Sequence, residues 1–326
     1  MSYHTIVSHR NFHHDEAWAI YLLKRFGGPK FPGIEDARVM FVDDPQCVKA
    51  EELIKNGEIC VGCGGGKYDE HGLSGEITCA AEMVANDLGL KNNRAVGNII
   101  EYVRKCDRTS DVRPQELPSL IKQWHKRHRD NPEVVMERTL GILADWLDSN
   151  LEFQKSFEAT NPKKIMFQLQ GSDKKICYAV FETDDSNVPT IARIKGVDIV
   201  VVKNARGNVQ IFTRGIKSPT GNVPVADLSD VVRIIRKGEI TARRITGLFP
   251  DVYLRRPEKL PEVPFWYYLE AGQLLLNGSD QGARGVEPTK LSLDDIIQAI
   301  KLGTRPFMPV TGRLATVGEV AKEVIG

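Results

Sequence analysis

Residues 9–19, HRNFHHDEAWA, bring histidines and carboxylates together directly after the apolar segment TIVS. The chain has seven histidines, and His9, His13 and Asp15 follow the spacing H-x3-H-x-D. On a turn that leaves a strand, residues at this spacing can converge on one point. Imidazole nitrogens combined with a carboxylate suit Mn, Fe, Co or Zn better than Mg or Ca. The segment therefore predicts metal-ion chemistry, with these three residues as ligands.

The alternative for this segment is a solvated polar turn in front of a helix. Asp15 and Glu16 suit the first turn of a helix, where a carboxylate meets the positive end of the helix dipole. We expect Glu16 to cap or brace that turn. His14, which stands between two expected ligands, should point away from them.

A second polar cluster, GKYDEHG, occupies residues 66–72 and contains Asp69, Glu70 and His71. Consecutive residues on a turn cannot all face one point. One or two of them are therefore expected to bind metal, while the third orients a ligand or contacts substrate. A hydrophilic loop is the alternative. Asp107 is a further candidate ligand, and the three cations around it in RKCDRTSD are its alternative partners.

Strands and helices alternate through the first half of the chain. This order predicts an α/β domain with a parallel sheet, and the carboxyl ends of parallel strands form binding sites. The two polar clusters each follow a strand, so we expect them to meet at one edge of the sheet. The expected strands are 4–8, 37–43 and 58–66, and the expected helices are 15–27, 45–57, 75–89 and 94–108.

The second half has a different pattern of predicted helices and strands. Residues 114–159 are helical and serve as a connector or as outer helices, and NPKK at 161–164 marks a domain boundary. We therefore expect a catalytic domain at 1–160 and a smaller α+β domain at 161–326. The latter should contain short strands at 164–171, 175–183, 190–196, 197–207 and 208–215, with helices at 228–238, 291–303 and 316–326.

Composition limits the function classes. Hydrophobic residues make up 41% of the 326 residues and the net charge is +1, which argues against a strongly basic nucleic-acid binder but allows a local basic groove. The basic run WHKRHR at 124–129 is either a guide for a nucleic-acid backbone or a solvated helix face. No apolar run is long enough to span a membrane and the N-terminus lacks a signal-peptide core, so we expect a cytoplasmic protein with reduced cysteines.

Two rival motifs surround the second cluster. GCGGG at 62–66 resembles a dinucleotide-binding glycine loop, but that loop must open a helix, which KYDEHG does not favour. Cys60 and Cys63 lack the second pair that a structural zinc site needs. Cys60 is expected in a buried strand, and Cys63 is close enough to the cluster to be an additional ligand.

SHRNFHHDEAWAIYLL resembles the opening motif of the melanocyte-proliferating-gene family of metal-dependent hydrolases, which are relatives of the DHH phosphoesterases. That family opens with a histidine after a strand and then a Phe-His-x-Asp-Glu-x-x-Ala segment, matched here by His9, Phe12, His13, Asp15, Glu16 and Ala19. Its next motif is similar to CVGCGGGKYDEHG, with matches at Val61, Gly64, Gly65, Tyr68, Asp69 and His71. The resemblance covers roughly residues 4–110 and continues more faintly through VQIFTRG and the segment from GQLLLNG onward.

The chain departs from this family at two positions. Gly62 stands where the family has a strand aspartate that bridges two metals, and Glu70 replaces the first histidine of a histidine pair. A glutamate can bind metal, so Glu70 can substitute. Nothing obvious replaces the bridging carboxylate unless Cys63 or Asp69 moves in. The site could thus hold one metal, a rearranged pair of metals, or be a degraded remnant.

The resemblance implies a DHH-like domain and a second domain, with the active site in the cleft between them. It implies a metal-dependent phosphoesterase of nucleic-acid ends or short oligonucleotides, with Mn expected first and Mg, Co or Zn as alternatives. The roles are metal binding by His9, His13, Asp15, Glu70 and Asp107, catalysis by His71 and Asp69, and substrate binding by Arg214, Asn277 and Arg284. The alternatives are a small-molecule phosphohydrolase and a catalytically weakened protein that binds nucleotide or nucleic acid. We also expect a homodimer.

Overall fold

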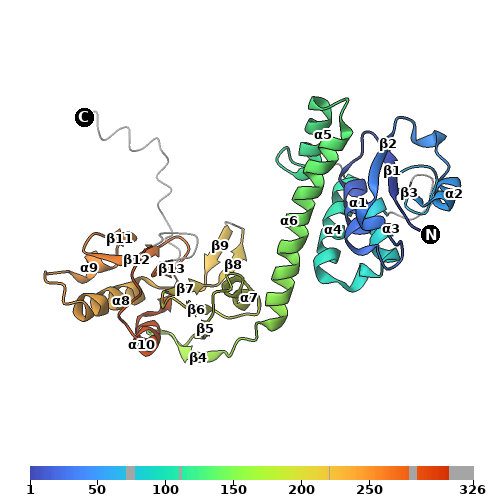
Figure 1. Cartoon of the computed structure of the whole chain (residues 1–326). Helices are drawn as coiled ribbons and strands as arrows, with labels where there is room; N and C mark the ends of the chain where they lie inside the picture. The colour runs from blue at the N-terminus through green and yellow to red at the C-terminus, as the bar shows by residue number, and fades with distance from the viewer. Residues whose placement is uncertain (71–77, 110–111, 220, 279–284, 308–326) are drawn as a thin grey trace. The chain divides into compact units, whose positions relative to one another are not determined.

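The computed structural model of the chain describes residues 1–70, 78–109, 112–219, 221–278 and 285–307. The chain divides into two compact units, at 1–155 and 156–326 (Figure 1). The chain is mixed α/β, with a parallel three-stranded sheet in the first unit and a larger mixed sheet in the second. No helix in the described part of the chain is both long and apolar enough to cross a membrane.

The sheet of the first unit is parallel throughout, as predicted. β1 (Thr5–His9) lies in the centre, between β2 (Arg38–Val42) and β3 (Glu58–Cys60). Residues 5–8 of β1 are all buried, because a central strand is covered on both faces. All three strands run in the same direction, so His9 and the segment after Cys60 emerge at the same edge.

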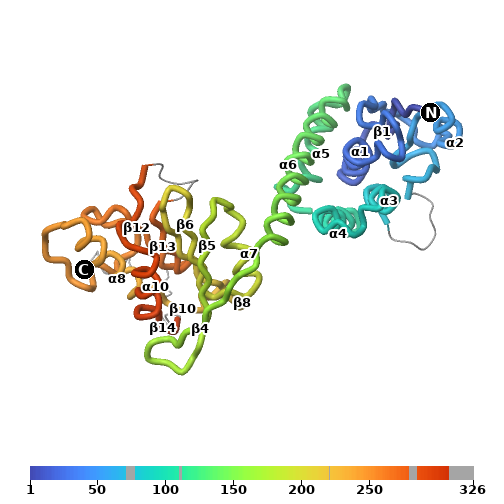
Figure 2. Tube along the Cα trace, turned by 60° about the horizontal axis from the view of Figure 1, so that its bottom comes forward, coloured from blue at the N-terminus to red at the C-terminus, as the bar shows by residue number. Residues whose placement is uncertain are grey.

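Helices and short helical turns surround this sheet (Figure 2). α1 follows β1 almost immediately, and its first half is entirely buried, with Trp18, Ile20, Leu22 and Leu23 in the core. The helices are α1 (His14–Phe26), α2 (Ala50–Leu53), α3 (Ala80–Asp87), α4 (Arg94–Thr109), α5 (Leu117–Arg127) and α6 (Pro132–Ala159). The 3-10 turns are Ile34–Asp36, Pro45–Cys47, Ile54–Asn56 and Leu90–Asn92.

The sheet of the second unit has seven strands in the order β11-β12-β13-β7-β6-β5-β4. β5 and β6 are parallel, and the other neighbouring pairs are antiparallel. The strands are β4 (Ile165–Gln168), β5 (Lys175–Glu182), β6 (Ile199–Lys203), β7 (Val209–Thr213), β11 (Glu258–Leu260), β12 (Val263–Leu269) and β13 (Leu274–Leu276). The second unit, expected to be the smaller, thus carries the larger sheet.

The other elements of the second unit complete its core and its margins. α8 and α10 pack against each other and supply Val231, Ile235, Ile296 and Ile300 to the buried cluster. The helices are α7 (Val188–Ile194), α8 (Ser229–Ala242), α9 (Asp251–Leu254) and α10 (Leu293–Gly303). The short strand pairs are β8 (Gly215–Ser218) with β9 (Gly221–Pro224), and β10 (Ala226–Asp227) with β14 (Arg305–Pro306).

Two predicted strands differ from the structure. The segment 190–196, predicted as a strand, lies mostly in α7, which has Pro189 in its first turn and connects the parallel strands β5 and β6. The strand predicted at 58–66 ends at Cys60, because Gly62, Gly64 and Gly65 adopt positive φ angles. The helix predicted at 316–326 lies outside the described residues.

Candidate metal centre

The two polar clusters meet at the carboxyl edge of the first sheet. His9 is the last residue of β1, and the backbone N–H of Val61 donates to the carbonyl oxygen of Val7 at 2.9 Å, which continues the β1–β3 pairing by one residue. Beyond it, Gly62 lies against the side chain of Glu16. The predicted convergence of two segments about fifty residues apart is therefore confirmed.

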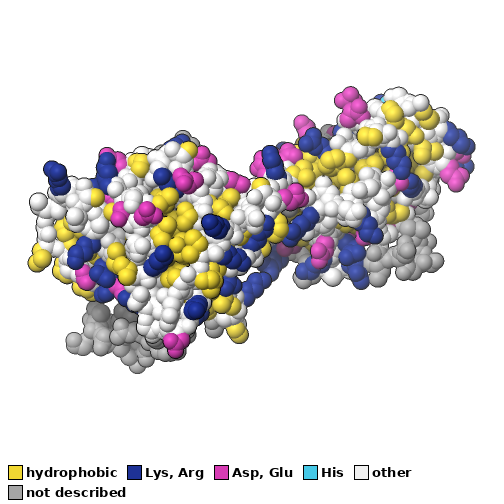
Figure 3. Space-filling view, turned by 90° about the horizontal axis from the view of Figure 1, so that it is seen from below, with side chains coloured by type: hydrophobic (Ala, Val, Ile, Leu, Met, Phe, Trp, Pro, Cys, Tyr) yellow, Lys and Arg dark blue, Asp and Glu magenta, His cyan; other side chains and the backbone are white. Residues whose placement is uncertain are grey.

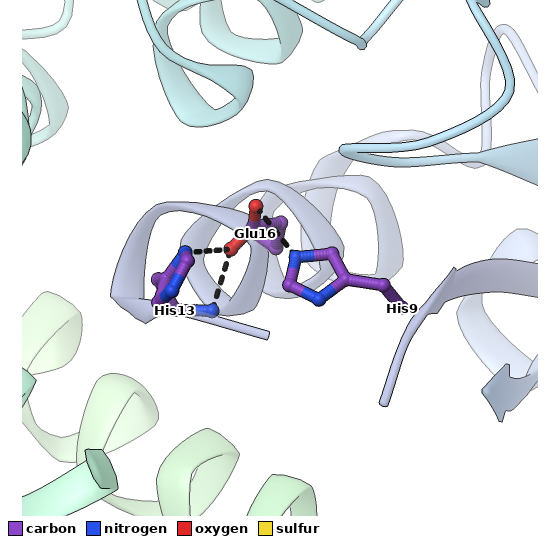
Figure 4. Close-up of side chains that lie close together, drawn as sticks. All are labelled: His9, His13 and Glu16. Atoms are coloured by element: carbon purple, nitrogen blue, oxygen red, sulfur yellow. Dashed lines mark hydrogen bonds and ion pairs between the residues drawn. The ribbon is translucent and has the colours of Figure 1, made fainter. Parts of the chain in front are cut away.

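Glu16 lies between two imidazole rings (Figure 4). Its Oε1 is 3.1 Å from Nε2 of His9, and its Oε2 is 3.7 Å from Nδ1 of His13. Oε2 also accepts a hydrogen bond from the backbone N–H of His13 at 2.6 Å, which caps α1. Glu16 is 1% exposed, whereas the side chain of His13 is 70% exposed. A buried carboxylate and two histidines thus form a group that is open to solvent on the His13 side.

The same Glu16 belongs to a second group, with Asp15 and Glu70. One carboxylate oxygen from each residue lies within 4.8 Å of the others. Asp15 is 1% exposed, and no described group donates a hydrogen bond to either of its oxygens. Two ionised carboxylates at such a distance repel each other by about 3–4 kcal/mol at an effective dielectric constant of 20. The second group therefore needs protons or a cation to hold its carboxylates together.

The acid–base properties of the two neighbours diverge in this environment. Burial, the charge of Glu16, a hydrogen bond that protonated Asp15 donates to Glu16, and then the charge of Glu70 raise the pKa of Asp15 well above its ordinary value. Burial also disfavours the charged form of Glu16, but the hydrogen bond from His9 and the charges of His9 and His13 outweigh it and hold the pKa of Glu16 at about 2. Glu16 is thus the carboxylate of the cluster that stays charged, and Asp15 is the one that needs compensation.

These residues fit a divalent cation. The first group, with two imidazoles and one carboxylate, is a donor set typical of Mn, Fe, Co or Zn sites, and the second group, with three carboxylates, suits Mn, Mg or Ca. The acceptor oxygens of Asp15 lack donors and face two other carboxylates, an arrangement that a cation would stabilise. The structure brings together four of the five predicted ligands, which are His9, His13, Asp15 and Glu70.

Gly62 is explained by the position of Glu16. A Cβ atom at Gly62 would lie 2.6 Å from Cγ and 2.7 Å from Oε1 of Glu16. The φ angle of Gly62 is +65°, which side-chain-bearing residues rarely adopt. Glu16 therefore occupies the space into which a side chain at position 62 would project, and the cluster receives a carboxylate from α1.

The remaining residues predicted for the first unit are placed differently. Asp69 is buried, accepts a hydrogen bond from the backbone N–H of Gly65 at 2.8 Å, and lies outside both groups, so it closes the turn after β3. Asp107 is exposed on α4 and also lies outside both groups. His14 points away, as expected, with Nε2 3.2 Å from the carbonyl oxygen of Val103. His71 lies outside the described residues.

The residues predicted to bind substrate lie in the second unit. Arg214 pairs with Asp198 at 2.6 Å. Asn277 is fully buried, donates to the carbonyl oxygens of Phe265 and Glu287, and accepts from the backbone N–H of Thr289. These contacts give Arg214 and Asn277 structural roles. Arg284 lies outside the described residues.

A cavity of about 900 Å³ adjoins the histidine group. His13, His14 and Asp107 line it, together with residues from α5. Asp107 thus faces the same space as His13, although it lies outside both groups. The exposed ring of His13 connects the buried carboxylates with this cavity.

Sequence reasoning missed Glu16 as a member of the centre. Glu16 stands three residues after the helix-capping residue His13, and this spacing predicts a capping carboxylate. A cap is also what the structure shows. The signal available in the sequence was the histidine three residues before Glu16, together with the glycine at position 62, which leaves space for a side chain.

Comparison of the chain with protein-family models, with curated proteins and with solved structures gives no match. The likeness to the melanocyte-proliferating-gene family therefore stays a prediction. The chemistry of the centre is argued from its own residues.

Proposed function

We propose that this chain is a metal-dependent phosphoesterase that hydrolyses phosphodiester bonds of nucleic-acid ends or short oligonucleotides. The observation that carries the proposal is the buried carboxyl of Asp15, which has no hydrogen-bond donor among the described residues and faces the carboxyls of Glu16 and Glu70. The DHH-like architecture and a role for the second unit in substrate binding belong to the same proposal.

The residues divide into those that hold the cation and those that meet substrate. His9, Asp15, Glu16 and Glu70 are the less exposed members and would hold one or two divalent ions, with Mn first. Such an ion lowers the pKa of a bound water and neutralises charge on a phosphoryl group. His13 faces the cavity and would complete the ligand set from the substrate side.

Glu16 positions the rest of the centre. Its Oε1 fixes the ring of His9, and its Oε2 fixes the first turn of α1, which carries Asp15 directly before Glu16. Because Glu16 stays charged down to a pH of about 2, this arrangement is present at any physiological pH. The ligands are thus prearranged before the cation arrives.

The test combines metal binding with cleavage. The full chain is stripped with EDTA, titrated with MnCl₂ by calorimetry, and then assayed on a labelled six-nucleotide strand with Mn²⁺. Asp15→Asn and His13→Ala should each weaken Mn²⁺ binding by more than about 10-fold and reduce cleavage accordingly. His128→Ala is the matched control, because His128 contacts Arg138 and lies outside both groups.

Other outcomes assign the chain differently. Strand binding without cleavage under Mn, Co or Mg contradicts the enzyme and supports a weakened nucleic-acid-binding protein. Cleavage of inorganic pyrophosphate or a phosphate monoester, but not of the strand, assigns a small-molecule phosphohydrolase. Unchanged Mn²⁺ binding in Asp15→Asn contradicts the metal centre itself.

A further inference from the structure

The cavity beside His13 carries an excess of positive charge. Among the described residues that line it, Arg10, Lys122, Lys126 and Arg129 are cations and Asp107 is the one carboxylate. Figure 3 shows both basic and acidic side chains on the face that it presents, and the net charge of the whole chain is +1. The cavity is therefore a local concentration of positive charge on a chain that is nearly neutral.

Three of the four cations have no ion-pair partner among the described residues. Arg10 pairs with Asp43 at 2.6 Å. Lys122, Lys126 and Arg129 form no ion pair with any residue that the structure describes. Unpaired cations around a concave surface attract an anion, since each remains available for a charge-assisted hydrogen bond.

The spacing of these cations places them on one side of α5. Lys122 and Lys126 are four residues apart and therefore share a helix face, separated by about 6 Å along the axis. Arg129 lies two residues beyond the end of the helix and lines the same cavity. Arg127 complements the negative end of the helix dipole but does not line the cavity.

His125 fixes α5 relative to the histidine group. Its Nε2 lies 3.0 Å from the carbonyl oxygen of Phe12, and the two rings meet edge to face at 4.6 Å. Phe12 is fully buried and directly precedes His13. The cations of α5 are therefore held at a defined position relative to the candidate metal centre.

We infer that this cavity binds the phosphate backbone of a single-stranded oligonucleotide and leads it to His13. The inference rests on the proposed function and specifies its substrate class. Three unpaired cations distributed over more than one helical turn suit several phosphates better than one. The cavity volume of about 900 Å³ also lies near the upper end of ligand sites, which span about 300–1,000 Å³.

The experiment measures binding without hydrolysis. A fluorescein-labelled six-nucleotide strand, as RNA and as DNA, is titrated with the full chain in EDTA and followed by anisotropy at several salt concentrations. In the variant Lys122→Gln/Lys126→Gln/Arg129→Gln, affinity should fall by more than about 10-fold at low salt. The slope of log affinity against log salt should fall by about 2, because each phosphate that a cation neutralises contributes about 0.7 to that slope.

A charge-matched control separates the cavity from net charge. Lys55→Gln/Lys105→Gln/Arg127→Gln also removes three exposed cations of the first unit, and none of the three lines the cavity. Affinity in this control should fall less than in the cavity variant, because none of the three charges lines the cavity and charges outside it are more strongly screened. Equal losses of affinity in the two triple variants would overturn the inference.

Three further outcomes separate the inference from the proposed function. Inorganic pyrophosphate is tested as a competitor of the labelled strand. If it displaces the strand as effectively as an unlabelled six-nucleotide strand, the inference is overturned in favour of a small-phosphate site. Cleavage by the parent chain together with unchanged strand binding in the cavity variant also overturns it, while the phosphoesterase stands. Cavity-dependent strand binding without Mn²⁺-dependent cleavage upholds the cavity and contradicts the phosphoesterase.

Discussion

Glu239 of the second unit and Asp15 of the first unit are both buried carboxylates, and their surroundings are opposite. Glu239 in α8 is fully buried and accepts hydrogen bonds from Nε of Arg243 at 2.7 Å, from Nε1 of Trp266 at 3.3 Å and from the backbone N–H of Lys290 at 3.0 Å. Asp15 in α1 is as deeply buried and receives none from a described residue. A carboxylate that serves the fold is supplied with donors. One that lacks them and faces other carboxylates is suited to an exogenous cation.

The largest effect is expected at Glu239. Glu239→Ala removes the acceptor of a buried network and leaves the N–H groups of Trp266 and Lys290 without partners. The free energy of unfolding of the second unit should fall by about 3–5 kcal/mol. Hydrogen exchange of peptides from this unit in increasing urea measures the loss. A change below about 1 kcal/mol would show that Glu239 and its donors do not stabilise the fold of the second unit.

The next effect concerns the contact between position 62 and Glu16. Gly62→Ala places a methyl group 2.6 Å from Cγ of Glu16 and strains the backbone, so the first unit should lose about 2–4 kcal/mol. Gly65→Ala is a matched control, because Gly65 has a φ of +61° and open space at its Cβ, and it should cost about 1–2 kcal/mol. Urea unfolding of both variants isolates the contact. Equal losses of stability would show that Glu16 does not occupy this space.

Asp15 should respond in the direction opposite to Glu239. Asp15→Asn replaces a carboxyl group, whose charged form is disfavoured by burial and by Glu16 and Glu70, with a neutral group that can donate. In EDTA, the free energy of unfolding of the first unit should rise by about 1–2 kcal/mol, while stabilisation by added Mn²⁺ should disappear. Urea unfolding with and without MnCl₂ gives both values. A loss of stability in EDTA would mean that Asp15 serves the fold as Glu239 does.

The smallest effect comes from Asp87, a carboxylate of the first unit that has donors. Burial opposes its charge, but hydrogen bonds from Lys30, Lys67 and Tyr68 outweigh it and lower the pKa of Asp87 to about 2. Its contribution is fully present above the unfolded pKa of about 3.9 and is lost as pH falls through about 2. The free energy of unfolding of the parent chain should exceed that of Asp87→Asn by about 1 kcal/mol at pH 5. This difference should vanish near pH 2.

Unfolding of the two chains across pH 2–5 checks this last expectation. A difference that stays constant down to pH 2 would mean that the charge of Asp87 does not stabilise the first unit. Asp87 could then not be used as an example of a carboxylate that stabilises the fold through its donors.

The sequence predicted the edge of the sheet better than the identity of the ligands. The alternation of strands and helices placed His9 and Glu70 at the carboxyl ends of parallel strands, and both belong to the centre. It could not give the direction in which each side chain points. Glu16, taken as a cap, is also the shared carboxylate, and Asp69, taken as catalytic, closes a turn. Both outcomes depend on the tertiary position of the turn after β3.

The second unit shows where local patterns fail. The β-branched residues of TIARIKG favour a strand, but a connection between two parallel strands requires a crossover, and this segment supplies its helix. Likewise, Asn277 stands beside a glycine and looks available for substrate, yet it is fully buried within its own unit. Whether a polar side chain is engaged depends on partners distant in sequence.

The capping role of Glu16 has a thermodynamic consequence. The oxygen that accepts from the backbone N–H of His13 belongs to the carboxylate shared by both candidate groups. Ion affinity and the local stability of the first turn of α1 are therefore linked quantities. A cation that binds the ordered turn more tightly reduces the fraying of this turn. By reciprocity, a change that promotes fraying lowers the affinity for the cation by the same factor. The amide of His13 thus reports occupancy of the centre through its rate of hydrogen exchange.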